Sequence, residues 1–174
     1  PILFFSAIIA DTPYCNDRSI GAGGTIDGTT FTELGYGTNS TMYGAGRRFT
    51  TNGPTGTTFG NTYANPTYKC AQNSDKFTVS SSIGNGALTN SVGLLTVDEA
   101  NYAGIILGTE NYSNYLNTGE IYWLMSPIQY SEGGYVYTIY PDGSGMPDQS
   151  FNIYAVLPAI SLKSITVMRG NGTY

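Results

Sequence analysis

Side chains that commonly carry out chemistry are scarce in this chain of 174 residues, which contains no histidine and two cysteines. Histidine is the usual general base near neutral pH and the commonest metal ligand, so its absence removes both options. The adjacent carboxylates Asp98 and Glu99 remain as candidates for an acid–base pair. Neighbouring side chains on a helix point about 100° apart, so these two carboxylates would not face each other as an acid–base pair. We expect them instead to stabilise the N-terminus of a helix through its dipole. The sequence therefore predicts a non-catalytic protein with no cofactor and no metal.

The two cysteines, Cys15 and Cys70, are too far apart in the chain for a metal-binding or redox motif of the CxxC type. One interpretation is a structural disulfide, which would close a loop of about 55 residues and contribute about 4 kcal/mol to stability. The other is two separate buried thiols in a cytosolic protein. We favour the disulfide, which predicts an extracellular or cell-surface location.

Fifteen tyrosines are the richest source of recognition chemistry in the chain. A tyrosine combines a rigid ring with a polar tip and suits a binding surface. The predicted ligand contacts lie in the C-terminal part of the chain and are Tyr130, Tyr135, Tyr137, Tyr140, Asp142 and Tyr154. The alternative is that such rings fill the core or stack across strands, which we prefer for Tyr122 and Trp123.

Charge excludes some partners. The chain has 7 Lys and Arg against 12 Asp and Glu, a net charge of −5, and its only adjacent basic residues are Arg47 and Arg48. Nucleic acid is therefore not an expected partner, because phosphate binding needs clustered cations.

No segment reaches the 18 or so apolar residues of a membrane span. The apolar residues 1–10 lack the basic start of a signal peptide and are expected to be a core strand or helix end, or to dock on a neighbouring subunit.

The elements that must position these residues follow from local patterns. Residues 21–66 are rich in Gly, Thr, Asn and Ser with isolated aromatics, which predicts long ordered loops, with a partly disordered linker as the alternative. Residues 96–104 form the one clear helix signal, because Thr96 and Glu99 make a capping box and Gly104 provides a left-handed stop.

Strand signals follow that helix. The expected strands are 121–125, 134–140, 152–157 and 159–162, with Tyr135 and Tyr137 alternating against Val136, Thr138 and Tyr140. Residues 141–143 predict a turn, and Pro127, Pro147 and Pro158 predict strand ends or an edge. The sum is a small α+β domain spanning 1–174, with a C-terminal meander.

Several motifs occur in an order that resembles a known family. They are residues 15–19 (CNDRS), 75–79 (DKFTV), 92–99 (VGLLTVDE), 103–104 (AG), 115–116 (YL), Gly119, 122–127 (YWLMSP) and 157–164 (LPAISLKS). Together they resemble surface-associated proteins of Gram-positive bacteria whose domain is similar to the C-type lectin-like fold of formylglycine-generating enzymes. The resemblance implies small antiparallel sheets, one or two short helices and long loops stapled by a disulfide.

The resemblance also bears on the cysteines and on activity. Cys15 and Cys70 match a cysteine pair of the family, whereas Leu157 stands where the family has an arginine, whose role is therefore not carried over. Neither cysteine lies near the C-terminus, where the oxidase branch has its pair, and the calcium motifs of lectins do not occur. The resemblance implies a non-catalytic domain that is a fragment or processed part of a longer precursor.

Two functions fit these observations. The first is an extracellular, surface-displayed adhesion or ligand-binding module whose tyrosine-rich C-terminal face recognises a glycan or a protein. The second is a structural subunit of an extracellular filament, such as a pilus or a phage-tail-like fibre, that packs against copies of itself. The low charge and the apolar residues 1–10 favour self-packing, because uncharged surfaces associate without desolvating ions.

Overall fold

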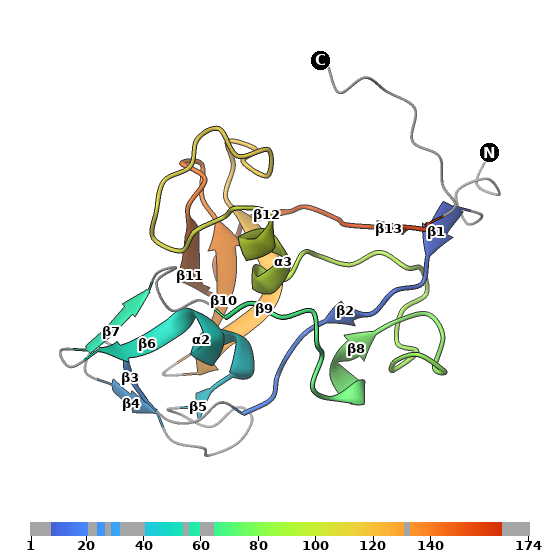
Figure 1. Ribbon diagram of the computed structural model, residues 1–174, viewed down its shortest axis with the longest axis horizontal. Helices are drawn as coiled ribbons and strands as arrows, with labels where there is room; N and C mark the ends of the chain where they lie inside the picture. Colours follow the sequence, from blue (N-terminus) through green and yellow to red (C-terminus); the bar gives the residue numbers. More distant parts are fainter. Residues whose placement is uncertain are drawn as a thin grey trace.

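The computed structural model describes residues 8–20, 24–26, 29–31, 41–53, 56–59, 65–130 and 133–164. These residues form small, mostly antiparallel sheets with two short α-helices (Figure 1). The strands are β1 (Ile9–Ala10), β2 (Tyr14–Cys15), β3 (Gly24–Ile26), β4 (Thr29–Phe31), β5 (Thr41–Met42), β6 (Thr50–Gly53), β7 (Gly56–Phe59), β8 (Lys76–Phe77), β9 (Tyr122–Tyr130), β10 (Gly134–Ile139), β11 (Gly145–Gln149), β12 (Ala155–Val156) and β13 (Ser161–Leu162). The helices are α2 (Gly44–Phe49) and α3 (Val97–Tyr102), and a 3-10 turn, η3 (Asn73–Asp75), precedes β8. The expected α+β class is confirmed.

The largest sheet has five strands in the order β11-β10-β9-β12, with β5 also paired to β9. The strands β9, β10 and β11 form the predicted antiparallel meander, whereas β12 runs parallel to β9. One face of β9 is buried at Tyr122, Leu124, Ser126 and Ile128. The alternation along this strand is the period-2 pattern of a half-buried sheet.

The strand β9 is longer than the sequence predicted, because Pro127 lies inside it and does not end it. The pairing with β10 shifts register on both sides of the Val136–Pro127 pair, so the ladder is irregular where proline lacks an N–H. The prolines Pro147 and Pro158 match the prediction, since Pro147 lies in the edge strand β11 and Pro158 follows β12.

The helix α3 begins as predicted. The hydroxyl of Thr96 accepts a hydrogen bond from the Glu99 backbone N–H, and the Glu99 carboxylate accepts one from the Thr96 N–H, which completes the capping box. The helix ends at Tyr102, and Gly104 has the left-handed φ of 92° expected of a stop. The backbone N–H of Val97 also donates to the Ser126 hydroxyl, which ties the start of the helix to β9.

The glycine-rich region 21–66 contains regular structure where the sequence predicted loops. It holds the antiparallel pairs β3–β4 and β6–β7, the strand β5 and the helix α2. Contacts with distant residues explain the difference, because β5 pairs with β9 and Phe49 of α2 is buried in the core. The helix approaches β9 so closely that a Cβ on Gly46 would lie 2.3 Å from the Ile128 carbonyl oxygen. Tyr36 and Tyr63 lie outside the described residues.

One core unites these elements. It contains Ala45 and Phe49 from α2, Val97 and Ala100 from α3, Ile105 and Leu107 from the segment after α3, Tyr122, Leu124 and Ile128 from β9, and Tyr137 and Ile139 from β10. The ring of Tyr122 is buried as predicted. The two helices therefore pack on β9 through the buried side of the largest sheet.

Two small ladders outside the largest sheet hold the first described strands, and one of them joins the two ends of the described chain. The strand β1 pairs with β13, and β2 pairs with β8, both antiparallel (Figure 1). A disulfide joins Cys15 of β2 to Cys70, with an S–S distance of 2.10 Å and a Cα–Cα distance of 5.7 Å, so the predicted pairing is confirmed. Residues 1–7, on which the docking prediction mainly rests, lie outside the described residues.

Candidate ligand-binding surfaces

The six predicted ligand contacts do not form one face. Tyr135 lies near the start of β10 and Tyr140 directly follows its end, about 17 Å away for an extended chain. Tyr130 pairs with Gly134, the residue before Tyr135, in the ladder between β9 and β10. The prediction of a single tyrosine surface is therefore too broad, and each tyrosine has its own environment.

Tyr137 is a core residue, which makes its assignment as a ligand contact wrong. Its side chain is 0% exposed, and its ring packs edge-on against Phe49 with centroids 6.0 Å apart. Burial raises the pKa of the Tyr137 phenol well above its ordinary value. The hydroxyl has no hydrogen-bond partner among the residues that the structure describes. Tyr137 therefore packs α2 on the sheet, and its side chain does not reach the surface.

Asp142 has a local role in a turn. Its carboxylate accepts hydrogen bonds from the backbone N–H of Ser144 at 2.8 Å and from the Ser144 hydroxyl at 2.7 Å. These bonds hold the pKa of Asp142 below its usual value, with the hydroxyl making the larger contribution. The predicted turn at residues 141–143 is confirmed, since the Tyr140 N–H donates to the Ser144 carbonyl oxygen and Gly143 has a φ of 78°.

The hydroxyl groups of Tyr135 and Tyr140 have different hydrogen-bond partners. The Tyr135 hydroxyl accepts a hydrogen bond from the Gln149 side-chain amide at 3.1 Å, and its half-buried ring packs beside the core. Tyr140 donates to the carboxylate of Asp148 at 2.7 Å. That carboxylate joins two of the predicted residues, Tyr140 and Tyr154.

We call this group the tyrosine–aspartate cluster, and it consists of Tyr140, Asp148, Asn152 and Tyr154. One carboxylate oxygen of Asp148 accepts hydrogen bonds from the Tyr140 and Tyr154 hydroxyls, at 2.7 and 2.8 Å. The other accepts from the Asn152 amide at 2.5 Å and from the Gln149 backbone N–H at 2.8 Å. The cluster connects the end of β10, the strand β11 and the loop that follows β11.

The electrostatics of the cluster match its geometry. Burial opposes the charge on Asp148, but the hydrogen bonds from Tyr140 and Tyr154 outweigh it and lower the pKa of the carboxyl. The same bonds raise the pKa of the Tyr140 and Tyr154 phenols, because losing either proton would bring two negative charges together. The cluster is therefore stable in one protonation state, with a charged aspartate and two neutral phenols.

The cluster supports an exposed loop. The ring of Tyr154 also contacts the ring of Trp123, with centroids 5.1 Å apart. Trp123 is half-buried on the outer face of β9, so its prediction as a core residue is wrong. Between Asp148 and Tyr154, the side chains of Phe151 and Ile153 are 69% and 97% exposed. Two large apolar side chains thus stand in solvent on a loop whose neighbours are fixed by hydrogen bonds.

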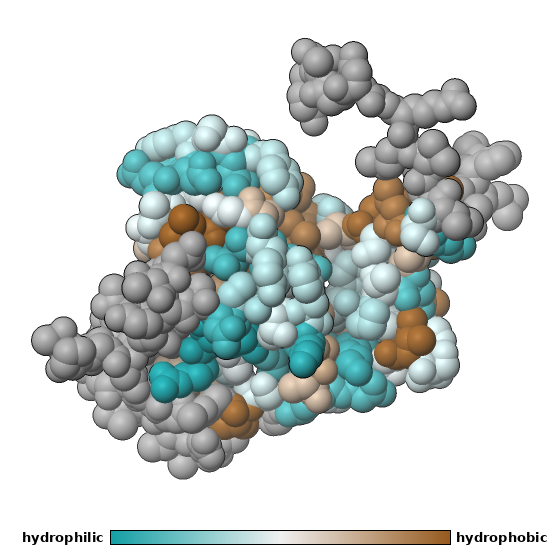
Figure 2. All heavy atoms as spheres, in the orientation of Figure 1, coloured by the Kyte–Doolittle hydropathy of each residue, from teal (hydrophilic) through white to brown (hydrophobic). Residues whose placement is uncertain are grey.

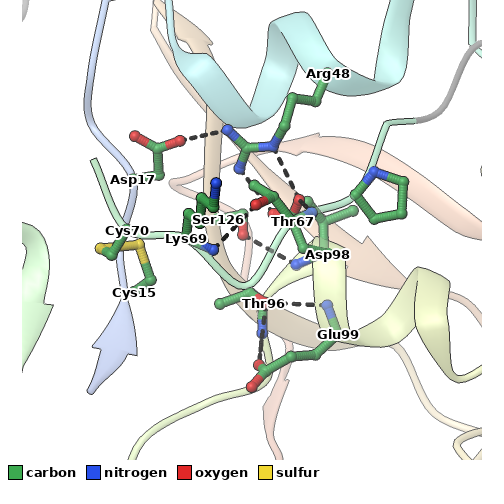
Figure 3. A network of polar contacts seen from close by, with 12 residues as sticks. Cys15, Asp17, Arg48, Thr67, Lys69, Cys70, Thr96, Asp98, Glu99 and Ser126 are labelled. Atoms are coloured by element: carbon green, nitrogen blue, oxygen red, sulfur yellow. Dashed lines mark hydrogen bonds and ion pairs between the residues drawn. A yellow bond between two sulfur atoms is a disulfide. The ribbon is translucent and has the colours of Figure 1, made fainter.

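A second group of polar residues was not predicted from the sequence. The guanidinium of Arg48, in α2, donates to Asp17 at 2.5 Å and to both carboxylate oxygens of Asp98 at 2.9 and 2.8 Å (Figure 3). Asp98 also accepts the backbone N–H of Thr67 at 2.9 Å. Burial disfavours the charge of Arg48, but the hydrogen bonds that it donates to Asp98 and Asp17 outweigh burial and raise the pKa of the guanidinium. The side chains of Asp98 and Glu99 therefore point to different partners, as expected. Glu99 caps α3, whereas Asp98 forms an ion pair.

The two aspartates in this network belong to segments that are distant in sequence. Asp17 follows the cysteine of β2, and Asp98 lies in the first turn of α3. No local pattern links either of them to Arg48, so sequence reasoning assigned Asp98 only to the helix dipole.

Other chemistry has little support among the described residues. Within residues 8–164, as far as the structure describes them, no group of three or more His, Cys, Asp or Glu side chains could hold a metal ion. None of the described helices is long and apolar enough to cross a membrane. Comparison with known protein families, with curated proteins and with solved structures finds no match to this chain.

Proposed function

We propose that this chain is a non-catalytic, extracellular binding module that contacts a protein partner through its C-terminal surface. The observation that carries the proposal is the exposed pair Phe151 and Ile153 on a loop anchored by the tyrosine–aspartate cluster. Large apolar side chains that lie together on an exposed surface mark interaction sites, and aromatic residues including Phe are enriched in interfaces. A loop that is already ordered loses little entropy on binding.

The disulfide supports the extracellular part of this proposal. Disulfides persist mainly in oxidising compartments, and both cysteines of the chain are paired. The C-type lectin-like domain is likewise our proposal. The small sheets, the two short helices and the Cys15–Cys70 pair agree with that resemblance, and β13 lies within the motif 157–164.

The experiment compares the chain with its Phe151→Ser, Ile153→Ser double variant on a panel of immobilised extracellular matrix and cell-surface proteins. We expect the double variant to melt at the same temperature as the native chain but to lose at least tenfold in affinity. Tyr115→Ala is the matched control, because Tyr115 is equally exposed, at 78%, but lies outside this loop. Unchanged affinity in the double variant, or no binding by the native chain, would contradict the proposal.

A filament subunit is the second candidate, favoured by the apolar outer surface of the last strands. Val156, Ile160 and Leu162 are all exposed on or beside β12 and β13. Among the described residues on the face shown in Figure 2, hydrophilic side chains predominate and the hydrophobic ones form separate spots. Fibres in negative-stain electron micrographs that disappear in the Ile160→Ser, Leu162→Ser variant would favour the filament, whereas a monomer throughout would exclude it.

A further inference from the structure

Two adjoining depressions flank the disulfide, and together we call them the disulfide groove. The inner pocket has a volume of about 140 Å³, and its polar lining includes Asp17, Arg48, Thr67, Asp98 and Glu99. The outer one is more open, with a volume of about 540 Å³, and its lining includes Cys70, Ala71 and Lys76. Pro13, Cys15, Tyr68 and Lys69 line both. The groove shares no residue with the tyrosine–aspartate cluster or with the Phe151–Ile153 loop.

The ring of Tyr68 stands at the junction of the two depressions and is 71% exposed. It stacks on Tyr102 with centroids 4.4 Å apart and planes inclined by 14°. Stacking covers one face of the Tyr68 ring and leaves the other available. An aromatic face of this kind can pack against the C–H face of a sugar ring, which is apolar on one side and polar at its edge.

The segment that carries Tyr68 is fixed on both sides. The Thr67 backbone N–H donates to Asp98 at 2.9 Å, and the Tyr102 hydroxyl donates to the Pro66 carbonyl oxygen at 2.9 Å. Two residues after Tyr68, Cys70 is bonded to Cys15. The exposed ring is therefore held in place before any ligand arrives, which reduces the entropic cost of binding.

The charges of the groove differ between its two ends. The inner pocket holds three carboxylates, of which Asp17 and Asp98 are paired with Arg48. The outer depression has Lys69 and Lys76 and no carboxylate in its lining, and neither lysine forms an ion pair with another described residue. Two ammonium groups without a carboxylate partner favour an anionic group on the ligand.

We propose that the disulfide groove binds a saccharide chain that bears a carboxylate. One sugar ring lies on the free face of Tyr68, the hydroxyl groups of the next extend into the polar inner pocket, and the carboxylate lies between Lys69 and Lys76. A peptide with apolar anchors fits less well, because the inner pocket is lined mainly by charged and hydroxyl side chains. This site is independent of the protein contact proposed above.

The test is calorimetric titration of the full chain with three acidic probes: trigalacturonate, a hyaluronan tetrasaccharide and an alginate trimer. The fully methyl-esterified trigalacturonate serves as the uncharged counterpart. We expect at least one acidic probe to bind, and the Tyr68→Ala variant to weaken that binding about tenfold, equivalent to about 1.4 kcal/mol. Tyr68→Phe retains the ring and should bind like the native chain.

The lysines provide a second measurement. The Lys69→Gln, Lys76→Gln variant should weaken binding of the acidic probe about tenfold at low salt, and should leave binding of the methyl ester unchanged. The Phe151→Ser, Ile153→Ser variant should bind the saccharide normally, so failure of the protein contact and failure of the groove are distinguishable. The proposal is overturned if no acidic probe binds, if Tyr68→Ala binds as tightly as Tyr115→Ala, or if the methyl ester binds as well as the acid.

Discussion

Arg48 and Asp98 are separated by 50 residues in the sequence and form a two-point ion pair, Nε to Oδ1 at 2.9 Å and Nη2 to Oδ2 at 2.8 Å. The Asp98 side chain is only 5% exposed and that of Arg48 19%. Asp17 contacts the remaining end of the guanidinium. One arginine therefore joins the helix α2 to the start of α3 and to the segment after β2.

We expect Arg48→Ala to lower the free energy of unfolding by about 3–5 kcal/mol, because removing one partner leaves two buried carboxylates without their counter-charge. Chemical denaturation monitored by circular dichroism measures this loss. The neighbouring Arg47→Ala is the control and should change stability by less than about 0.5 kcal/mol, since Arg47 forms no ion pair with a carboxylate of the described residues. Equal effects of the two substitutions would contradict the assignment of the ion pair.

Tyr137→Phe should leave stability unchanged or raise it by about 1 kcal/mol, because the buried Tyr137 hydroxyl has no hydrogen-bond partner among the described residues. Tyr137→Ala should instead cost about 3–5 kcal/mol, because it empties the space beside Phe49. Thermal melts of both variants separate ring packing from hydroxyl bonding. A large loss in Tyr137→Phe would mean that the hydroxyl is bonded after all.

Two glycines with the same φ allow a matched comparison. Gly143 and Gly119 both have a φ of 78°, but a Cβ on Gly143 would lie 2.1 Å from the Asn111 carbonyl oxygen, whereas nothing lies within 4 Å at Gly119. Gly119→Ala should cost about 1 kcal/mol from backbone strain alone. Gly143→Ala should cost at least about 2 kcal/mol more, because the turn must move away from Asn111. Denaturant midpoints provide the comparison, and equal losses would contradict the close approach.

Loss of the Cys15–Cys70 bond should lower the free energy of unfolding by about 4 kcal/mol, because the bond closes a loop of 55 residues. The Cys15→Ser, Cys70→Ser variant and the native chain in reductant should melt at similar, lower temperatures. The native chain without reductant is the reference. A melting temperature that does not respond to reductant would argue against the bond.

The tyrosine–aspartate cluster predicts a pH dependence on both sides of neutrality. The pKa of Asp148 is lowered by folding, so its contribution is present above about pH 4 and is lost as the pH falls below it. The pKa of Tyr140 is raised, so its contribution is present below about pH 10 and is lost above it. Asp148→Asn should therefore destabilise by about 2 kcal/mol between pH 5 and pH 9, as expected for hydrogen bonds to a charged group, and by less outside that range. A difference that does not vary with pH would contradict this account.

Local patterns in the sequence determined the parts of the fold that depend on neighbouring residues. The capping box of Thr96 and Glu99, the stop at Gly104 and the turn at residues 141–143 were all predicted correctly. Each involves backbone groups a few residues apart, so the residue types are sufficient to specify it. The disulfide was also predicted, because the chain has two cysteines and no competing partner for them.

Contacts between distant segments decided the rest. The helix α2 forms in a glycine-rich stretch because Ala45 and Phe49 are covered by the sheet, and Arg48 acquires its role from carboxylates on two other segments. The alternation of residues along β10 predicted that Tyr135 and Tyr137 share one side of the strand. It did not predict that α2 covers this side at Tyr137, where Phe49 contacts the tyrosine ring. Sequence periodicity therefore determined which residues share a face of the sheet. Tertiary structure alone decided which part of that face is covered, because burial depends on elements that pack across it from far along the chain.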